Sequence, residues 1–137
     1  MTETSNAKEQ TPIIFLDDIR VVFNTRTGSI LHPNKVTAVD GLTIKLMPGE
    51  TIGIVGESGC GKSVTAQTVM KLNPMPPARI PQGEVHLGEH DIVKASEKEM
   101  QKLRGKEVSM IFQDPMTCLN PTKTVGKQIV EAIRHHR

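Results

Sequence analysis

Eight consecutive residues near the middle of the chain have the types and spacing needed to hold a phosphate group. They match the pattern G-x-x-x-x-G-K-[ST] and are Gly56, Glu57, Ser58, Gly59, Cys60, Gly61, Lys62 and Ser63. Glycines at these positions let the backbone curl, so that successive N–H groups point inward and form a nest for an anion. Lys62 would bridge the β- and γ-phosphates of a nucleotide, and the Ser63 hydroxyl would bind Mg²⁺. The pattern predicts a phosphate loop, and the alternative is a chance match in a glycine-containing turn.

A phosphate loop needs a strand before it and a helix after it. The apolar run Thr51–Val55 predicts a buried strand that leads into the loop. A helix is expected to begin near Lys62 and to end before Asn73, because prolines follow and cannot continue it. The N-terminus of such a helix adds about half a positive charge behind the nest.

The segments before the loop predict antiparallel strands. β-Branched and aromatic residues indicate one or two strand segments over Ile13–Phe23, and residues 24–34 carry the turn residues of a hairpin loop. A further strand is expected around Leu42–Leu46, followed by a turn at Pro48 and Gly49.

The segments after the loop predict short strands and two helices. The strands are expected at Gly83–Leu87 and Val108–Gln113. Ser96 and Glu99 have the spacing of a capping box, so a helix is expected over 97–104, with Gly105 at its end. A last helix is indicated by apolar residues at helical spacing, Val125, Ile129 and Ile133.

The composition argues against several classes of protein. The chain has 137 residues, 36% of them hydrophobic and 23% charged, enough to fold as one domain or as part of one. Its net charge is only +2, which argues against a nucleic-acid partner. A membrane-spanning helix and a secretory signal are not expected, because no apolar run is long enough and the first residues are polar. The two cysteines, Cys60 and Cys118, are too few for a disulfide scaffold and fit a reducing cytosol.

The phosphate loop alone does not distinguish an ATPase from a GTPase or a kinase. Gln113 ends a predicted strand some fifty residues after the loop, where its side-chain amide could bind Mg²⁺ and orient water. The alternative is an ordinary polar residue at a strand end. The guanine-reading pattern Asn-Lys-x-Asp is absent from the sequence, which argues against a GTPase.

Taken in order, these features resemble the nucleotide-binding subunit of an ABC transporter. The resemblance rests on Phe23, on the strings AVDG, GE and GEV, on the phosphate loop GESGCGKS, and on IFQDP around Gln113. The longer strings EMQKLRG, MIFQDPMTCLNP and VGKQI are similar to the branch that imports oligopeptides, dipeptides and nickel into bacteria. The resemblance covers residues 12–137, and residues 1–11 are expected to be a disordered lead-in.

The resemblance implies an α/β fold of the P-loop NTPase class. It would have an antiparallel β subdomain and a partial mixed core sheet, truncated at the start of the helical subdomain. Phe23 would stack on adenine, although a core phenylalanine is the alternative. The backbone N–H of Val64 would lie near the α-phosphate, and Gln113 would sense the γ-phosphate and Mg²⁺.

The resemblance also implies a function and partners. ATP hydrolysis with Mg²⁺ would drive uptake of oligopeptides or dipeptides, at the cytoplasmic face of the bacterial cell membrane. The partners would be transmembrane permease subunits beside the loop of Gln113, a second ATPase subunit and, indirectly, an extracytoplasmic peptide-binding protein.

Three family features are missing from this sequence, namely the signature motif, the second acidic motif and the switch histidine. We therefore expect a fragment that binds ATP without efficient turnover. Two other functions stay open: a small P-loop kinase, and an interaction module without catalysis.

Overall fold

The computed structural model describes residues 11–29, 32–113 and 119–135, which divide into two compact units. The first unit ends at Ala95 and the second begins at Ser96. The expected lead-in lies almost wholly outside the described residues, and so does Cys118.

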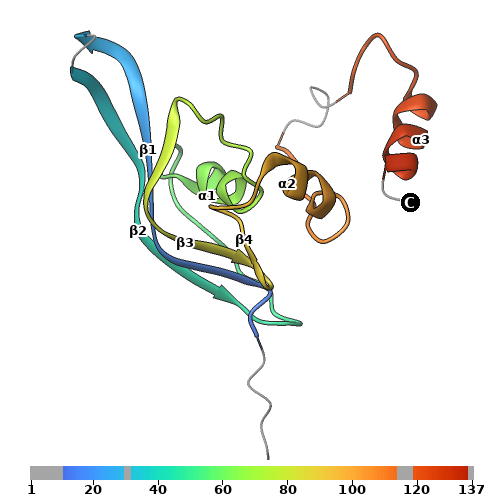
Figure 1. The fold of residues 1–137 in the computed structure, drawn as a ribbon, viewed down its shortest axis with the longest axis horizontal. Coiled ribbons are helices and arrows are strands. Elements are labelled where there is room, and N and C mark those ends of the chain that lie inside the picture. The colour runs from blue at the N-terminus through green and yellow to red at the C-terminus, as the bar shows by residue number, and fades with distance from the viewer. Residues whose placement is uncertain (1–10, 30–31, 114–118, 136–137) are drawn as a thin grey trace, which may run out of the picture. The chain divides into compact units, whose positions relative to one another are not determined.

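The first unit is built on a four-stranded antiparallel sheet in the order β2-β1-β3-β4 (Figure 1). Its strands are β1 (Ile14–Ser29), β2 (His32–Leu46), β3 (Ala78–Leu87) and β4 (His90–Asp91). β1 lies between β2 and β3, and the last residue that it pairs with β3 is Phe23. Beyond Phe23, β1 and β2 continue as a two-stranded ribbon.

Two irregular positions keep the apolar residues of β1 and β3 on one face of the sheet. Asp18 in β1 has a left-handed backbone with φ of +46°, and Gly83 in β3 has φ of +92°. A Cβ on Gly83 would lie 2.5 Å from the carbonyl oxygens of both Asp17 and Asp18, so only glycine fits there. Each irregularity changes which residues of its strand point inward. The buried side chains of these strands and of β2 are Leu16, Ile19, Val21, Val39, Ala78, Val85 and Leu87.

The helix expected after the phosphate loop is confirmed as α1 (Lys62–Val69). It contacts β2 and β3 and contributes the buried Thr65, Thr68 and Val69. Figure 1 shows α1 beside the sheet formed by the blue, teal and yellow-green strands. The helix ends before Asn73, as predicted.

The second unit contains α2 (Glu97–Leu103) and α3 (Val125–His135). The predicted capping box is confirmed at α2, because the Glu99 N–H donates to Ser96 Oγ and the Ser96 N–H donates to the Glu99 carboxylate. Gly105 has φ of +83° directly after the helix, as its expected role requires. In α3 the predicted apolar residues Val125 and Ile129 are about half exposed.

Two strand predictions are wrong. Thr51–Val55 and Val108–Gln113 contain no strand, and Val55 and Ile111 are 96% and 95% exposed. A buried strand of a core sheet is stable only between neighbouring strands that complete its hydrogen bonds. No strand among the described residues pairs with either segment. The α/β class holds, but the described sheet is wholly antiparallel and includes neither predicted core strand.

The hairpin loop predicted over 24–34 is also wrong in extent, because β1 continues to Ser29 and β2 begins at His32. The strands expected at Leu42–Leu46 and Gly83–Leu87 are confirmed and are longer than predicted.

Candidate functional site

The Lys62 ammonium lies inside the phosphate loop. Its Nζ donates to the carbonyl oxygens of Gly56 and Glu57, at 2.6 Å each, and lies 3.4 Å from the Cys60 Sγ. The backbone of Gly56 and Glu57 therefore curls around the lysine that follows it. This geometry places a positive charge at the mouth of the loop, beside the first turn of α1.

Three glycines of the loop stand where a side chain would be strained or would collide. Gly59 and Gly61 have φ of +85° and +90°, a region that L side chains rarely adopt. A Cβ on Gly61 would also collide with the carbonyl oxygen of Ala38 in β2. A Cβ on Gly56 would lie 2.5 Å from the Cys60 Sγ. At Gly61 the loop therefore lies closer to the backbone of β2 than a residue with a side chain would allow.

The sequence analysis did not assign Ala38 a role in the site. Ala38 falls where the β1–β2 register shifts, between the pairs Val21–Val39 and Val22–Thr37. A register shift of this kind leaves one residue of a strand unpaired and turns its backbone. Here it brings the Ala38 carbonyl to Gly61. Such a contact depends on pairing between distant segments, so the local sequence carries no signal for it.

The start of α1 is held by side-chain hydrogen bonds. Thr65 Oγ1 donates to the Gly61 carbonyl at 3.0 Å, and Thr68 Oγ1 donates to the Val64 carbonyl at 2.7 Å. Asn73 Nδ2, which is buried, donates to the same Val64 carbonyl at 3.2 Å. Ser63 is exposed in the first helical turn, where its hydroxyl is accessible to a ligand.

Phe23 faces the same side of the sheet as the core. It pairs with the buried Ala78 and alternates with the buried Val21, whose partner Val39 lies next to Gly61. Paired residues and alternate residues of a strand share a face. Phe23 is half-buried, so part of its ring is accessible. This placement fits either a core residue or an adenine platform.

Gln113 belongs to the second unit and is exposed. Its expected place beside the phosphates stays a prediction. The next five residues of the IFQDPMTC string, from Asp114 to Cys118, lie outside the described residues.

The charged and polar groups of the loop suit a nucleoside triphosphate. The Lys62 ammonium and the N-terminus of α1 both favour phosphate. The exposed Ser63 hydroxyl is an oxygen ligand of the kind that Mg²⁺ takes beside phosphates. Among the described residues, no group of three or more His, Cys, Asp or Glu side chains forms a separate metal site.

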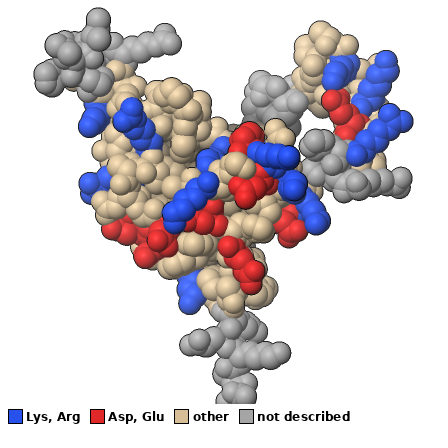
Figure 2. All heavy atoms as spheres, in the orientation of Figure 1, with Lys and Arg blue, Asp and Glu red and all other residues tan. Residues whose placement is uncertain are grey.

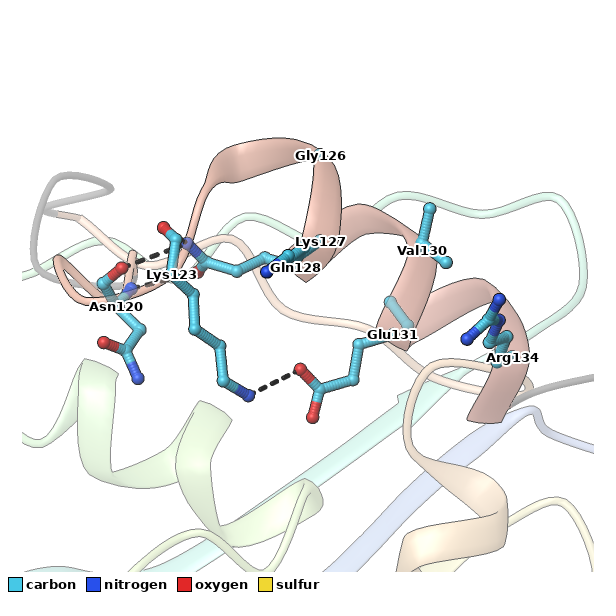
Figure 3. A pocket seen from close by; sticks show the side chains of 9 residues that line it. Asn120, Lys123, Gly126, Lys127, Gln128, Val130, Glu131 and Arg134 are labelled. Atoms are coloured by element: carbon cyan, nitrogen blue, oxygen red, sulfur yellow. Dashed lines mark hydrogen bonds and ion pairs between the residues drawn. The ribbon is translucent and has the colours of Figure 1, made fainter.

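The described residues of the second unit also form a hollow. It is an open groove of about 1170 Å³ along α3 (Figure 3). Lys123 Nζ reaches Glu131 at 2.8 Å, and Gln128 bonds back to the N–H and carbonyl of Asn120. These bonds tie the turn before α3 to the helix.

Charges of both signs lie close together on the visible face. Figure 2 shows Lys and Arg side chains interspersed with Asp and Glu, without a single basic stripe on that face. None of the helices in the described segments is both long and apolar enough to cross a membrane.

Known proteins resemble nearly the whole chain. The family model of ABC transporters matches residues 39–136. The oligopeptide transport ATP-binding protein OppD of Bacillus subtilis is 51% identical over 126 residues, which are 92% of this chain and 34% of that protein. The dipeptide transport ATP-binding protein DppD of Bacillus subtilis is 46% identical over 125 residues, which are 91% of this chain and 36% of that protein. A probable D,D-dipeptide transport ATP-binding protein of Escherichia coli is 44% identical over 126 residues, which are 92% of this chain and 37% of that protein. The chain thus spans about a third of the length of these relatives.

Proposed function

Because the chain belongs to the ABC transporter family, we propose that it is the nucleotide-binding part of an ATP-hydrolysing transport subunit, with ATP held by the phosphate loop. The observation that carries this proposal is the Lys62 ammonium enclosed by the carbonyls of Gly56 and Glu57. A loop that already holds a cation at its mouth is arranged to receive the β- and γ-phosphates.

The remaining residues of the site are assigned by the same reasoning. The phosphate-binding residues are proposed to be Gly56 to Ser63 and Val64, since the loop leads directly into the N-terminus of α1. Phe23 is the proposed adenine platform, supported by its position on the core face of the sheet beside the Val21–Val39 pair.

Ser63 and Gln113 are the residues that would hold Mg²⁺. When bound, Mg²⁺ neutralises charge on the phosphates. Ser63 offers its exposed hydroxyl, and Gln113 offers a side-chain amide oxygen that would also orient water.

The transported substrate is proposed to be an oligopeptide or dipeptide. The relatives named for oligopeptide and dipeptide transport share 51% and 46% identity with the chain. By analogy with transport ATP-binding proteins, the partners are permease subunits in the membrane, a second ATPase subunit and, indirectly, an extracytoplasmic peptide-binding protein. The chain would then work peripherally, at the cytoplasmic face of the bacterial membrane.

Calorimetric titration with Mg²⁺-ATP tests the nucleotide site. Lys62→Ala removes the ammonium and should weaken binding by about 1.5–3 kcal/mol, the scale of a charge-assisted hydrogen bond. Lys98→Ala is the matched control, because Lys98 is an exposed lysine of α2 outside the loop. Equal affinity of the parent and Lys62→Ala would overturn the proposal, and so would a parent that does not bind ATP.

A further inference from the structure

The C-terminal end of α1 has an unusual residue in its turn. The Leu72 N–H donates to the Gln67 carbonyl at 2.8 Å, and the Lys71 N–H donates to the Thr68 carbonyl at 3.0 Å. This pair of bonds is the Schellman motif, in which the residue after the C-cap is usually glycine because its backbone is left-handed. Here that residue is Lys71, with φ of +50°. After α2, the residue that follows the C-cap is a glycine, Gly105, with φ of +83°.

The Lys71 side chain explains why a lysine stands there. Its Nζ donates to the carbonyl of Val93 at 2.9 Å and to that of Ala95 at 2.5 Å. Both carbonyls belong to residues 91–95, the segment through which the chain leaves the first unit. We call this segment the exit turn. Glycine would suit the backbone of position 71 better, but it would make neither bond.

The exit turn is closed by bonds of its own. The Ala95 N–H donates to the Asp91 carbonyl at 2.9 Å, and the Lys94 N–H donates to the Asp91 carboxylate at 3.2 Å. The Lys94 ammonium pairs with the same carboxylate at 2.7 Å, and this bond holds the pKa of Asp91 below its ordinary value. Because both N–H groups are hydrogen-bonded only when the turn is closed, the hydrogen-exchange rates of the Lys94 and Ala95 amides measure how often the turn opens.

We propose that Lys71 is a positioning residue that couples occupancy of the phosphate loop to closure of the exit turn. α1 has only eight residues, with Lys62 in its first position and Lys71 two residues past its last. Its middle is tied by the bonds of Thr68 and Asn73 to the Val64 carbonyl. A ligand that stabilises the first turn of so short a helix also stabilises its last turn, and Lys71 passes this stabilisation to the exit turn.

This inference rests on the proposed nucleotide site and is tested by hydrogen exchange with and without Mg²⁺-ATP. In the parent, ATP should slow exchange of the Lys94 and Ala95 amides about fivefold or more, the lower range of coupling between two sites. Lys71→Gly keeps the helix end, because glycine favours the left-handed backbone, but it should abolish this slowing. Lys71→Arg keeps a donor of the same charge and should retain it. The Ile13 amide, which bonds to Leu46 in the sheet, is the control within the first unit.

The outcomes separate this inference from the proposed function. A parent that binds ATP in calorimetry without slowing the two amides overturns the role of Lys71 and leaves the nucleotide site intact. Slowing that persists in Lys71→Gly, when parent and variant are compared at saturating ATP, overturns it as well. A parent that does not bind ATP overturns both. Slowing that is lost in Lys71→Gly and kept in Lys71→Arg supports the proposal.

Discussion

Gly59 and Gly61 allow a paired test of how the phosphate loop is held on the sheet. Both have a φ in the left-handed region, +85° and +90°, so alanine is strained at either position. Their surroundings differ. Nothing lies within 4 Å of a Cβ built on Gly59, whereas a Cβ on Gly61 would collide with the Ala38 carbonyl. The difference between the two alanine variants therefore measures the contact between the loop and β2.

The expected losses in the free energy of unfolding follow from the backbone strain and from the collision with the Ala38 carbonyl. A non-glycine residue in this backbone region loses about 1–2 kcal/mol, so Gly59→Ala should reduce the free energy of unfolding by that amount. Gly61→Ala is strained as well and in addition must displace a strand backbone, for a further loss of about 1–3 kcal/mol. Because the Ala38 carbonyl belongs to the main chain, Ala38→Gly should not rescue Gly61→Ala.

Urea unfolding followed by far-ultraviolet circular dichroism provides the measurement, since the chain contains neither Trp nor Tyr. The parent, both alanine variants and the double variant with Ala38→Gly are compared at one pH. Equal losses in Gly59→Ala and Gly61→Ala would refute the reasoning, because the contact with β2 would then contribute nothing. Rescue by Ala38→Gly would refute it as well.

Two further predictions concern a thiol and a carboxylate. Gly56→Ala should destabilise the chain by about 1 kcal/mol, because its Cβ displaces the Cys60 Sγ from Lys62, and the loss should vanish in a Cys60→Ala background. A double-mutant cycle measures this, and an equal loss in both backgrounds contradicts it. The hydrogen bond from the Lys94 side chain lowers the pKa of Asp91 in the folded chain from its ordinary value of 3.8. The ionised carboxylate therefore stabilises the folded chain above pH 3.8, and this stabilisation is lost as the pH falls through the lower pKa of the folded state. Unfolding of Asp91→Asn should thus depend less on pH in this acidic range, and an unchanged pH profile would contradict the assignment.

Local signals predicted the parts of the molecule that depend on short stretches of sequence. The capping box of Ser96 and Glu99 and the start of α1 at Lys62 are confirmed because their bonds join residues a few positions apart. Gly105 was likewise identified from its place just after a helix. The glycines of the phosphate loop follow the same rule, since their backbone conformation is a property of the loop itself.

Predictions failed where distant segments decide the structure. Thr51–Val55 has the composition of a buried strand, but composition does not supply the neighbouring strands with which it would pair. Lys71 gave no signal at the end of α1, because a lysine in a left-handed turn is explained only by the carbonyls of Val93 and Ala95, far along the chain. The contact of Gly61 with Ala38 cannot be predicted from the local sequence for the same reason.

The pairing of β1 with β3 joins the beginning and the end of the first unit. Phe23 and Ala78 are partners across the sheet although the phosphate loop and α1 lie between them along the chain. Residues 51–55, which contain no helix or strand, are exposed and join the sheet to the phosphate loop. A single backbone cut there would leave two polypeptides joined by the hydrogen bonds of the sheet. Such a cut would create two new chain ends in an exposed segment that takes no part in the hydrogen bonds of the sheet.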